Sequence, residues 1–109
     1  MIINFDKMDI TNMPNFKGGE GCVDANMFFD GTNRIFKATL KKGSSIGYHL
    51  HETSSEIMYF LQGVATINYN GEIRYAKAGE VHYCKKGNMH SVKNEQDEDL
   101  VMVCVVPEQ

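Results

Sequence analysis

Glycine-containing turn signals recur through the chain from residue 30 onward and leave only short segments between them. The dipeptides are Asp30-Gly31, Lys42-Gly43, Gln62-Gly63, Asn70-Gly71, Ala78-Gly79 and Lys86-Gly87. Short β-prone segments separated by such turns are typical of antiparallel strands. The predicted strands cover residues 34–40, 48–51, 56–61, 64–69, 73–76, 81–84, 89–92 and 100–106. About eight short strands of this kind predict an all-β sandwich or small barrel.

The length of the chain limits it to one compact domain. Its 109 residues, 42% of them hydrophobic, are enough for a modest core but not for two. Residues 6–24 are rich in Asn, Gly and Asp and are predicted to be irregular. We therefore expect residues 1–30 to form an N-terminal arm and first strand, and residues 31–109 to form the barrel.

Charge and cysteine content restrict the partners and the compartment. The net charge is −3, and no basic cluster is longer than Lys41-Lys42 or Lys85-Lys86. This predicts no nucleic-acid and no membrane partner, and favours a small-molecule ligand. No apolar run is long enough to span a bilayer. Cys22, Cys84 and Cys104 lack paired close spacing and are predicted to be reduced thiols in a cytoplasmic protein.

One short segment contains the residue types of a metal site. His49 and His51 lie two residues apart, so on a strand their imidazoles project from the same face. Glu56 follows a polar turn at residues 52–55 and begins the next predicted strand, so a hairpin would return its carboxylate to the two imidazoles. Two nitrogens and one oxygen on one face predict a partial metal-ligand set.

These residues also belong to two motifs by which the chain resembles the cupin superfamily. The first motif is matched by Gly43, His49, His51, Glu56 and Gly63, and the second by Gly79, Gly87, His90 and Asn94. One departure is Lys85, which stands where the second motif usually carries a proline. The resemblance implies a double-stranded β-helix, or jelly-roll barrel, with a metal ion held inside its mouth.

The same resemblance implies a complete ligand set of three histidines and one carboxylate. Residue by residue, the ligands are His49, His51, Glu56 and His90. The fourth, His90, is assigned by the resemblance alone, because strand pairing over that distance cannot be inferred from one sequence. Such a set suits a divalent transition metal, namely Mn, Fe, Ni, Co or Zn.

Three functions are compatible with this site. Three imidazoles and a carboxylate leave an octahedral ion with open positions, where a small oxygen-rich ligand such as a hydroxy acid, a 2-oxo acid or a sugar derivative can chelate. The resemblance implies a metal-dependent dioxygenase, decarboxylase, isomerase or lyase. The alternatives are a non-catalytic module that binds or senses a small molecule, and a metal-free epimerase-like or isomerase-like barrel that uses a histidine base.

The sequence also predicts a role or a location for three residues outside the ligand set. His82 is a candidate catalytic residue, with equal weight on a structural histidine and on an acid/base or metal-supporting group. Arg34 is interpreted as a surface arginine in preference to an anion-binding one. If Glu56 points inward, strand alternation directs Tyr59 to the outer face, and an apolar outer face predicts a homodimer.

Overall fold

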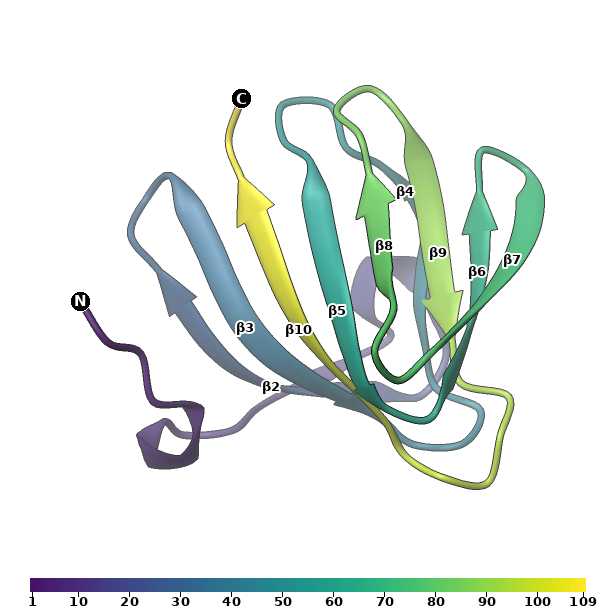
Figure 1. Ribbon diagram of the computed structural model, residues 1–109, viewed down its shortest axis with the longest axis horizontal. Helices are drawn as coiled ribbons and strands as arrows, with labels where there is room; N and C mark the ends of the chain where they lie inside the picture. The colour runs from purple at the N-terminus through teal and green to yellow at the C-terminus, as the bar shows by residue number, and fades with distance from the viewer.

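The computed structural model describes residues 1–109 and consists almost entirely of antiparallel strands in two facing sheets (Figure 1). One sheet has six strands in the order β1-β2-β3-β10-β5-β8, and the other has four in the order β4-β9-β6-β7. The strands are β1 (Thr11–Pro14), β2 (Cys22–Phe29), β3 (Asn33–Leu40), β4 (Ser45–Leu50), β5 (Glu56–Gln62), β6 (Val64–Tyr69), β7 (Glu72–Lys77), β8 (Val81–Cys84), β9 (Met89–Lys93) and β10 (Leu100–Pro107). Two 3-10 helices, η1 (Phe5–Lys7) and η2 (Phe16–Gly18), complete the elements.

From β3 onward the chain passes back and forth between the two sheets. Strands β3, β5, β8 and β10 belong to the six-stranded sheet, whereas β4, β6, β7 and β9 belong to the four-stranded one. Only the β6–β7 hairpin stays within one sheet. This winding makes the double-stranded β-helix and confirms the predicted all-β jelly-roll fold.

Side chains alternate across β5 as its sequence predicts. Glu56, Met58 and Phe60 are buried, whereas the intervening side chains are exposed. On β3 the buried set is Phe36, Ala38 and Leu40. These inward-facing side chains meet those of the four-stranded sheet in one hydrophobic core, because each sheet can bury its apolar face only against the other.

The N-terminal region differs from the irregular segment predicted for residues 6–24. It contains β1 and the start of β2, two strands that extend the six-stranded sheet beyond β3. Pro14 is tolerated because β1 is the edge strand, where a missing backbone donor breaks no inner ladder. Strand β2 is held by the buried side chains of Val23 and Ala25. Neither helix of the chain has the length and apolar character needed to cross a membrane.

Asn94 organises the loop between β9 and β10. Its side chain is fully buried, and its amide nitrogen donates to the carbonyls of Leu40 at 2.8 Å and Glu98 at 2.9 Å. Its Oδ1 accepts a hydrogen bond from the backbone of Gln96 at 2.9 Å. The buried side chain of Asn94 therefore connects this loop to the end of β3.

Candidate metal centre

A β-bulge on β4 directs two histidines into the barrel. Ile46 pairs with Val92 of β9, but the next recorded pair is His49 with His90, so β4 carries one extra residue between them. Because one extra residue inverts the alternation of a strand, His49 and His51 share the inward side with Ile46, while the side chains between them are exposed.

Gly47 lies within this bulge and is needed there. A Cβ atom on Gly47 would approach the backbone oxygen of Lys17 to 2.1 Å, so the η2 segment leaves no room for a side chain. The carbonyl of Gly47 in turn accepts a hydrogen bond from Nδ1 of His49 at 2.7 Å. The bulge at Gly47 therefore combines a close backbone approach with the orientation of a histidine.

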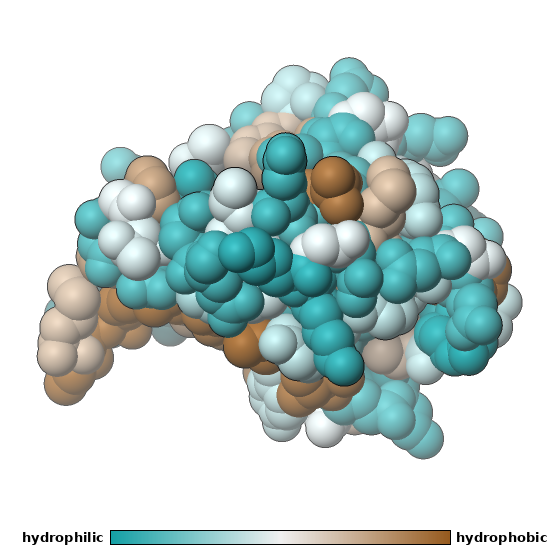
Figure 2. Space-filling view, turned by 90° about the horizontal axis from the view of Figure 1, so that it is seen from above, coloured by the Kyte–Doolittle hydropathy of each residue, from teal (hydrophilic) through white to brown (hydrophobic).

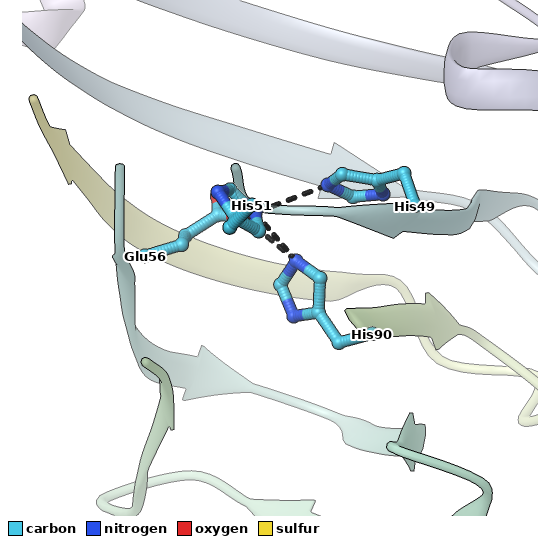
Figure 3. A group of neighbouring side chains, drawn as sticks. All are labelled: His49, His51, Glu56 and His90. Carbon is cyan, nitrogen blue, oxygen red and sulfur yellow. Dashed lines mark hydrogen bonds and ion pairs between the residues drawn. The ribbon is translucent and has the colours of Figure 1, made fainter. Parts of the chain in front are cut away.

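Four candidate ligands converge at the mouth of the barrel (Figure 3). Nε2 of His51 lies 3.1 Å from Nε2 of His49 and 3.0 Å from Nε2 of His90. Oε1 of Glu56, at the start of β5, lies 3.2 Å from Nε2 of His51 and 3.0 Å from Nε2 of His90. All four ligand atoms lie within 4.8 Å of one another.

The opposite nitrogen of each imidazole has a partner of its own. Nδ1 of His49 donates to the carbonyl of Gly47, Nδ1 of His51 lies 3.0 Å from Oγ of Ser54, and Nδ1 of His90 lies 3.0 Å from Nε2 of His82. A carbonyl can only accept, so His49 carries its proton on Nδ1 and presents a lone pair at Nε2. Such partners fix the ring orientation and tautomer of metal-ligating histidines.

The donor set fits a divalent ion. Ligand atoms about 2.1 Å from an ion and at right angles to one another lie about 3.0 Å apart, and the four recorded separations are 3.0–3.2 Å. Converging lone pairs and a carboxylate repel one another unless a cation lies between them. Imidazole nitrogen and carboxylate oxygen are ligands that Mn, Fe, Co, Ni and Zn all accept.

The protonation states of His49 and Glu56 at neutral pH also favour the binding of a cation. Burial lowers the pKa of the His49 imidazole to about 4, so the ring is neutral. Burial acts to raise the pKa of Glu56, but hydrogen bonds with His51 and His90 outweigh burial and lower this pKa to about 2. Neutral imidazole and ionised carboxylate are the forms that coordinate metals.

The cluster opens into a cavity of about 420 Å³. His49, His51 and Glu56 line one side of it. The other walls mix apolar with polar side chains and come from strands β1, β2, β3, β4 and β10, the residue after β10, the segment around η2 and the turn before β5. They comprise Met13, Phe16, Lys17, Met27, Arg34, Phe36, Ile46, Leu50, Glu52, Thr53, Ser54, Val106 and Glu108. A cavity of this size accommodates a small organic molecule.

The structure brings the four predicted metal ligands together but places His82 elsewhere. His82 lies behind His90, outside the residues that line the cavity, with its ring edge-on to Tyr69 at 5.4 Å. Burial lowers the pKa of His82 to about 4. Sequence reasoning missed the supporting roles of Ser54 and the Gly47 carbonyl, for which no pattern gave a signal.

Arg34, interpreted from the sequence as a surface residue, is half-buried and lines the cavity. The strand pattern left open which face of β3 points inward. The structure shows that Arg34 shares the inward face with Phe36.

Known proteins agree with this architecture. An oxalate-binding protein of Thermotoga maritima is 30% identical over 97% of this chain and 93% of its own length. The crystal structure of a predicted oxalate decarboxylase from the same organism superimposes with a TM-score of 0.93 at 29% identity, over 100% of both chains. An RmlC-like cupin of Shewanella frigidimarina shares the fold alone, with a TM-score of 0.81 at 15% identity over 99% of this chain and 90% of its own.

The sequence profile of the cupin domain matches residues 36–106, a span that runs from β3 to β10 and includes all four candidate ligands. With two facing sheets, a histidine-carboxylate cluster at the mouth and this match over more than half of its length, the chain belongs to the cupin superfamily.

Proposed function

We propose that this protein is a metal-dependent enzyme that acts on a small oxygen-rich carboxylic acid, with oxalate as the first candidate. The observation that carries the proposal is the convergence of His49, His51, Glu56 and His90 within 4.8 Å at the wall of a cavity. The similarity to an oxalate-binding protein over nearly the whole chain supports the ligand class.

Different residues of the site would have different roles. His49, His51, Glu56 and His90 would hold a divalent transition ion, and their partners keep each imidazole turned toward it. When bound, the ion supplies Lewis-acid polarisation of a ligand oxygen at its open positions. Apolar side chains such as Met27 and Phe36 line part of the cavity and would contact the carbon atoms of a bound ligand.

A binding or sensing module is the second candidate. It is favoured by the description of the Thermotoga relative as an oxalate-binding protein, which names binding and no reaction. Both candidates require the same metal site. They differ only in whether the bound acid is converted.

The test combines metal analysis with turnover. Protein purified without a metal-affinity tag should contain close to one equivalent of a divalent transition metal, and the variant with His49→Ala and His51→Ala should contain none. Oxalate consumption by the metal-loaded protein, absent in that variant, supports the enzyme. Saturable oxalate binding without consumption supports the binding module, and equal metal content in both proteins contradicts the metal site itself.

For His82 we propose a positioning role. Its Nε2 lies 3.0 Å from Nδ1 of His90. In this role Nε2 of His82 would accept a hydrogen bond from Nδ1 of His90, which would leave Nε2 of His90 free as a ligand atom. A metal-free barrel with His82 as its base would need this side chain in the cavity, which it does not line. Activity that survives removal of metal by a chelator would revive that alternative.

We also propose that the protein is a homodimer. Ile57, Tyr59 and Leu61 on β5 and Val81 and Tyr83 on the neighbouring edge strand β8 are all exposed. Figure 2 shows hydrophobic side chains gathered along one side of the molecule. An apolar sheet face that ends in an unpaired edge suits an isologous contact with a second copy.

Sedimentation tests the dimer. The wild type should sediment as a dimer at micromolar concentration, and Tyr59→Lys should shift it to a monomer because a charge is buried in the contact. Tyr75→Lys on β7, in the other sheet, is the matched control because Tyr75 is also exposed. A monomeric wild type would contradict the proposal.

A cytoplasmic location is part of the same proposal. It is supported by three free cysteines, Cys22, Cys84 and Cys104, because thiols stay reduced in the cytosol. Fractionation of cells that express the chain tests the location.

A further inference from the structure

Arg34 points into the cavity from the wall formed by the six-stranded sheet. Along β3 it belongs to the alternate set that includes the buried residues Phe36, Ala38 and Leu40, so its side chain leaves the inner face of the sheet. Its cross-strand neighbours are Val106 on one side and Phe29 on the other. Arg34 is the inward residue of β3 nearest to the strand's beginning, above the apolar core.

The guanidinium is held in place but has no anionic partner. Its Cζ lies 4.2 Å from the centroid of the Phe29 ring, and Nη1 lies 3.4 Å from the sulfur of Met27. A thioether is a weak acceptor, and the guanidinium carries five N–H donors. None of the ion pairs in the chain involves Arg34. Glu52 and Glu108 also line the cavity, but both are exposed and farther than 4.0 Å from its guanidinium.

The cavity therefore has two different polar sites in its lining. One is the cluster of His49, His51 and Glu56, which suits a cation. The other is Arg34, whose flat donor array matches both oxygens of a carboxylate. Apolar side chains such as Met27 and Phe36 belong to the same lining. A ligand that satisfies both sites needs two oxygen-rich ends.

We infer that Arg34 binds a carboxylate of the ligand and that the cavity is selective for small dicarboxylates, with one end at the histidine cluster and the other at Arg34. The inference rests on the proposed function, because the first end requires the metal site. It goes further by assigning the second end to a residue outside the cupin motifs.

Matched pairs of ligands test the inference. Each pair consists of a dicarboxylate and its monoamide, which differ by one charge at nearly constant shape: oxalate and oxamate, malonate and malonamate, succinate and succinamate. Binding to the metal-loaded protein is measured by titration calorimetry for the wild type, Arg34→Gln and Arg34→Lys. Arg74→Gln is the control, because Arg74 is exposed on β7 and does not line the cavity.

In the wild type we expect at least one dicarboxylate to bind about 10- to 100-fold more tightly than its monoamide, the range for hydrogen bonds to a charged group. Arg34→Gln should reduce this ratio to near one while monoamide affinity and metal content stay unchanged. Arg34→Lys should give an intermediate ratio, because the charge remains but the two-pronged contact is lost. Arg74→Gln should behave like the wild type.

Two results would overturn the inference. One is a wild type that prefers no dicarboxylate over its monoamide, and the other is a preference that persists in Arg34→Gln. Both leave the proposed metal site intact as long as metal content still depends on His49 and His51. Metal content that does not depend on those histidines is the separate failure of the proposed function.

Discussion

The inner face of β5 buries two very different side chains at its two ends. Glu56 near the start is 4% exposed, and Phe60 near the end is 0% exposed. Phe60 lies in the hydrophobic core, where removal of its ring from water stabilises the fold. Glu56 gains nothing from burial, which by itself raises its pKa, and depends on His51 and His90 beside it.

The difference shows how one strand supports both stability and function. Glu56 and Phe60 lie four residues apart on the same inner face of β5, yet one lies in the polar cluster and the other in the apolar core. Burial of the polar end costs free energy, which is recovered only through its partners or a bound cation. We therefore expect changes at the Phe60 end to affect folding first, and changes at the Glu56 end to affect metal binding first.

The largest effect is expected from Phe60→Ala. Loss of the ring leaves a cavity in the core, and the free energy of unfolding should fall by about 3–5 kcal/mol. Urea denaturation of the metal-free protein measures the change. Ile57→Ala, on the same strand but on the exposed face, is the control and should cost clearly less. Equal losses in the two variants would mean that the inner face of β5 is not the core.

At the other end, Glu56→Gln should weaken metal binding more than it affects folding. The amide keeps the shape of the side chain but removes the charge, so metal affinity should fall by more than about 100-fold, the upper range for loss of a supporting residue. Competition with a chelator of known affinity measures it. Glu72→Gln is the control, since Glu72 is an exposed carboxylate paired with Arg74. Unchanged metal affinity in Glu56→Gln would remove the carboxylate from the site.

A smaller effect is expected from His82, which acts through His90. His82→Phe removes the acceptor for Nδ1 of His90 and should lower metal affinity about 10- to 100-fold. His82→Gln retains an acceptor oxygen and should recover part of the loss. Absorption spectra of the cobalt-loaded proteins should shift in the Phe variant and return toward wild type in the Gln variant. Identical affinity and spectra in all three proteins would make His82 merely structural.

The smallest effect is expected in the pH dependence of folding, which depends on two imidazoles at and beside the polar cluster, His49 and His82. Burial lowers the pKa of His49 and His82 to about 4 in the folded protein, whereas an unfolded histidine titrates near 6.5. The unfolded chain therefore takes up protons first, and the stability of the metal-free protein should decline as the pH falls from about 6.5 to about 4.

Urea denaturation between pH 7 and pH 4 measures this decline. Because His82→Phe removes one of the two groups, its decline should be shallower than that of the wild type. Glu56, with its pKa lowered to about 2, adds a loss only below about pH 4.5. A stability that stays constant down to pH 4 would contradict the burial of the two neutral imidazoles.

Much of the barrel was predictable because its signals are local. Glycine turns and β-prone segments located all eight strands from β3 to β10, two of them, β6 and β8, to the residue. Within residues 1–30 the sequence predicted one strand without bounds, whereas the structure has two, β1 and β2. The first contains Pro14 and forms only as a sheet edge. The second has only a weak alternation of small buried residues, Val23 and Ala25, with the polar Asp24 between them. The many turn-forming residues of the preceding segment obscured this alternation.

The candidate site was predictable in its chemistry and less so in its geometry. His49, His51 and Glu56 are near one another in sequence, whereas His90 needed the pairing of β9 with β4. The side of the barrel that receives Arg34 depends on which face of β3 is buried, and strand alternation alone does not choose between two faces.

The order of residues along the chain determined by itself the strand periods, the turns and the types of ligand atom, because each depends on neighbours a few positions away. Tertiary structure decided where those atoms point. The bulge at Gly47 turns His49 to the inside, the β4–β9 ladder sets His90 opposite it, and the facing sheet supplies Glu56 and Arg34. Packing of one sheet against the other is what selects these directions, since only one face of each strand can be buried between them.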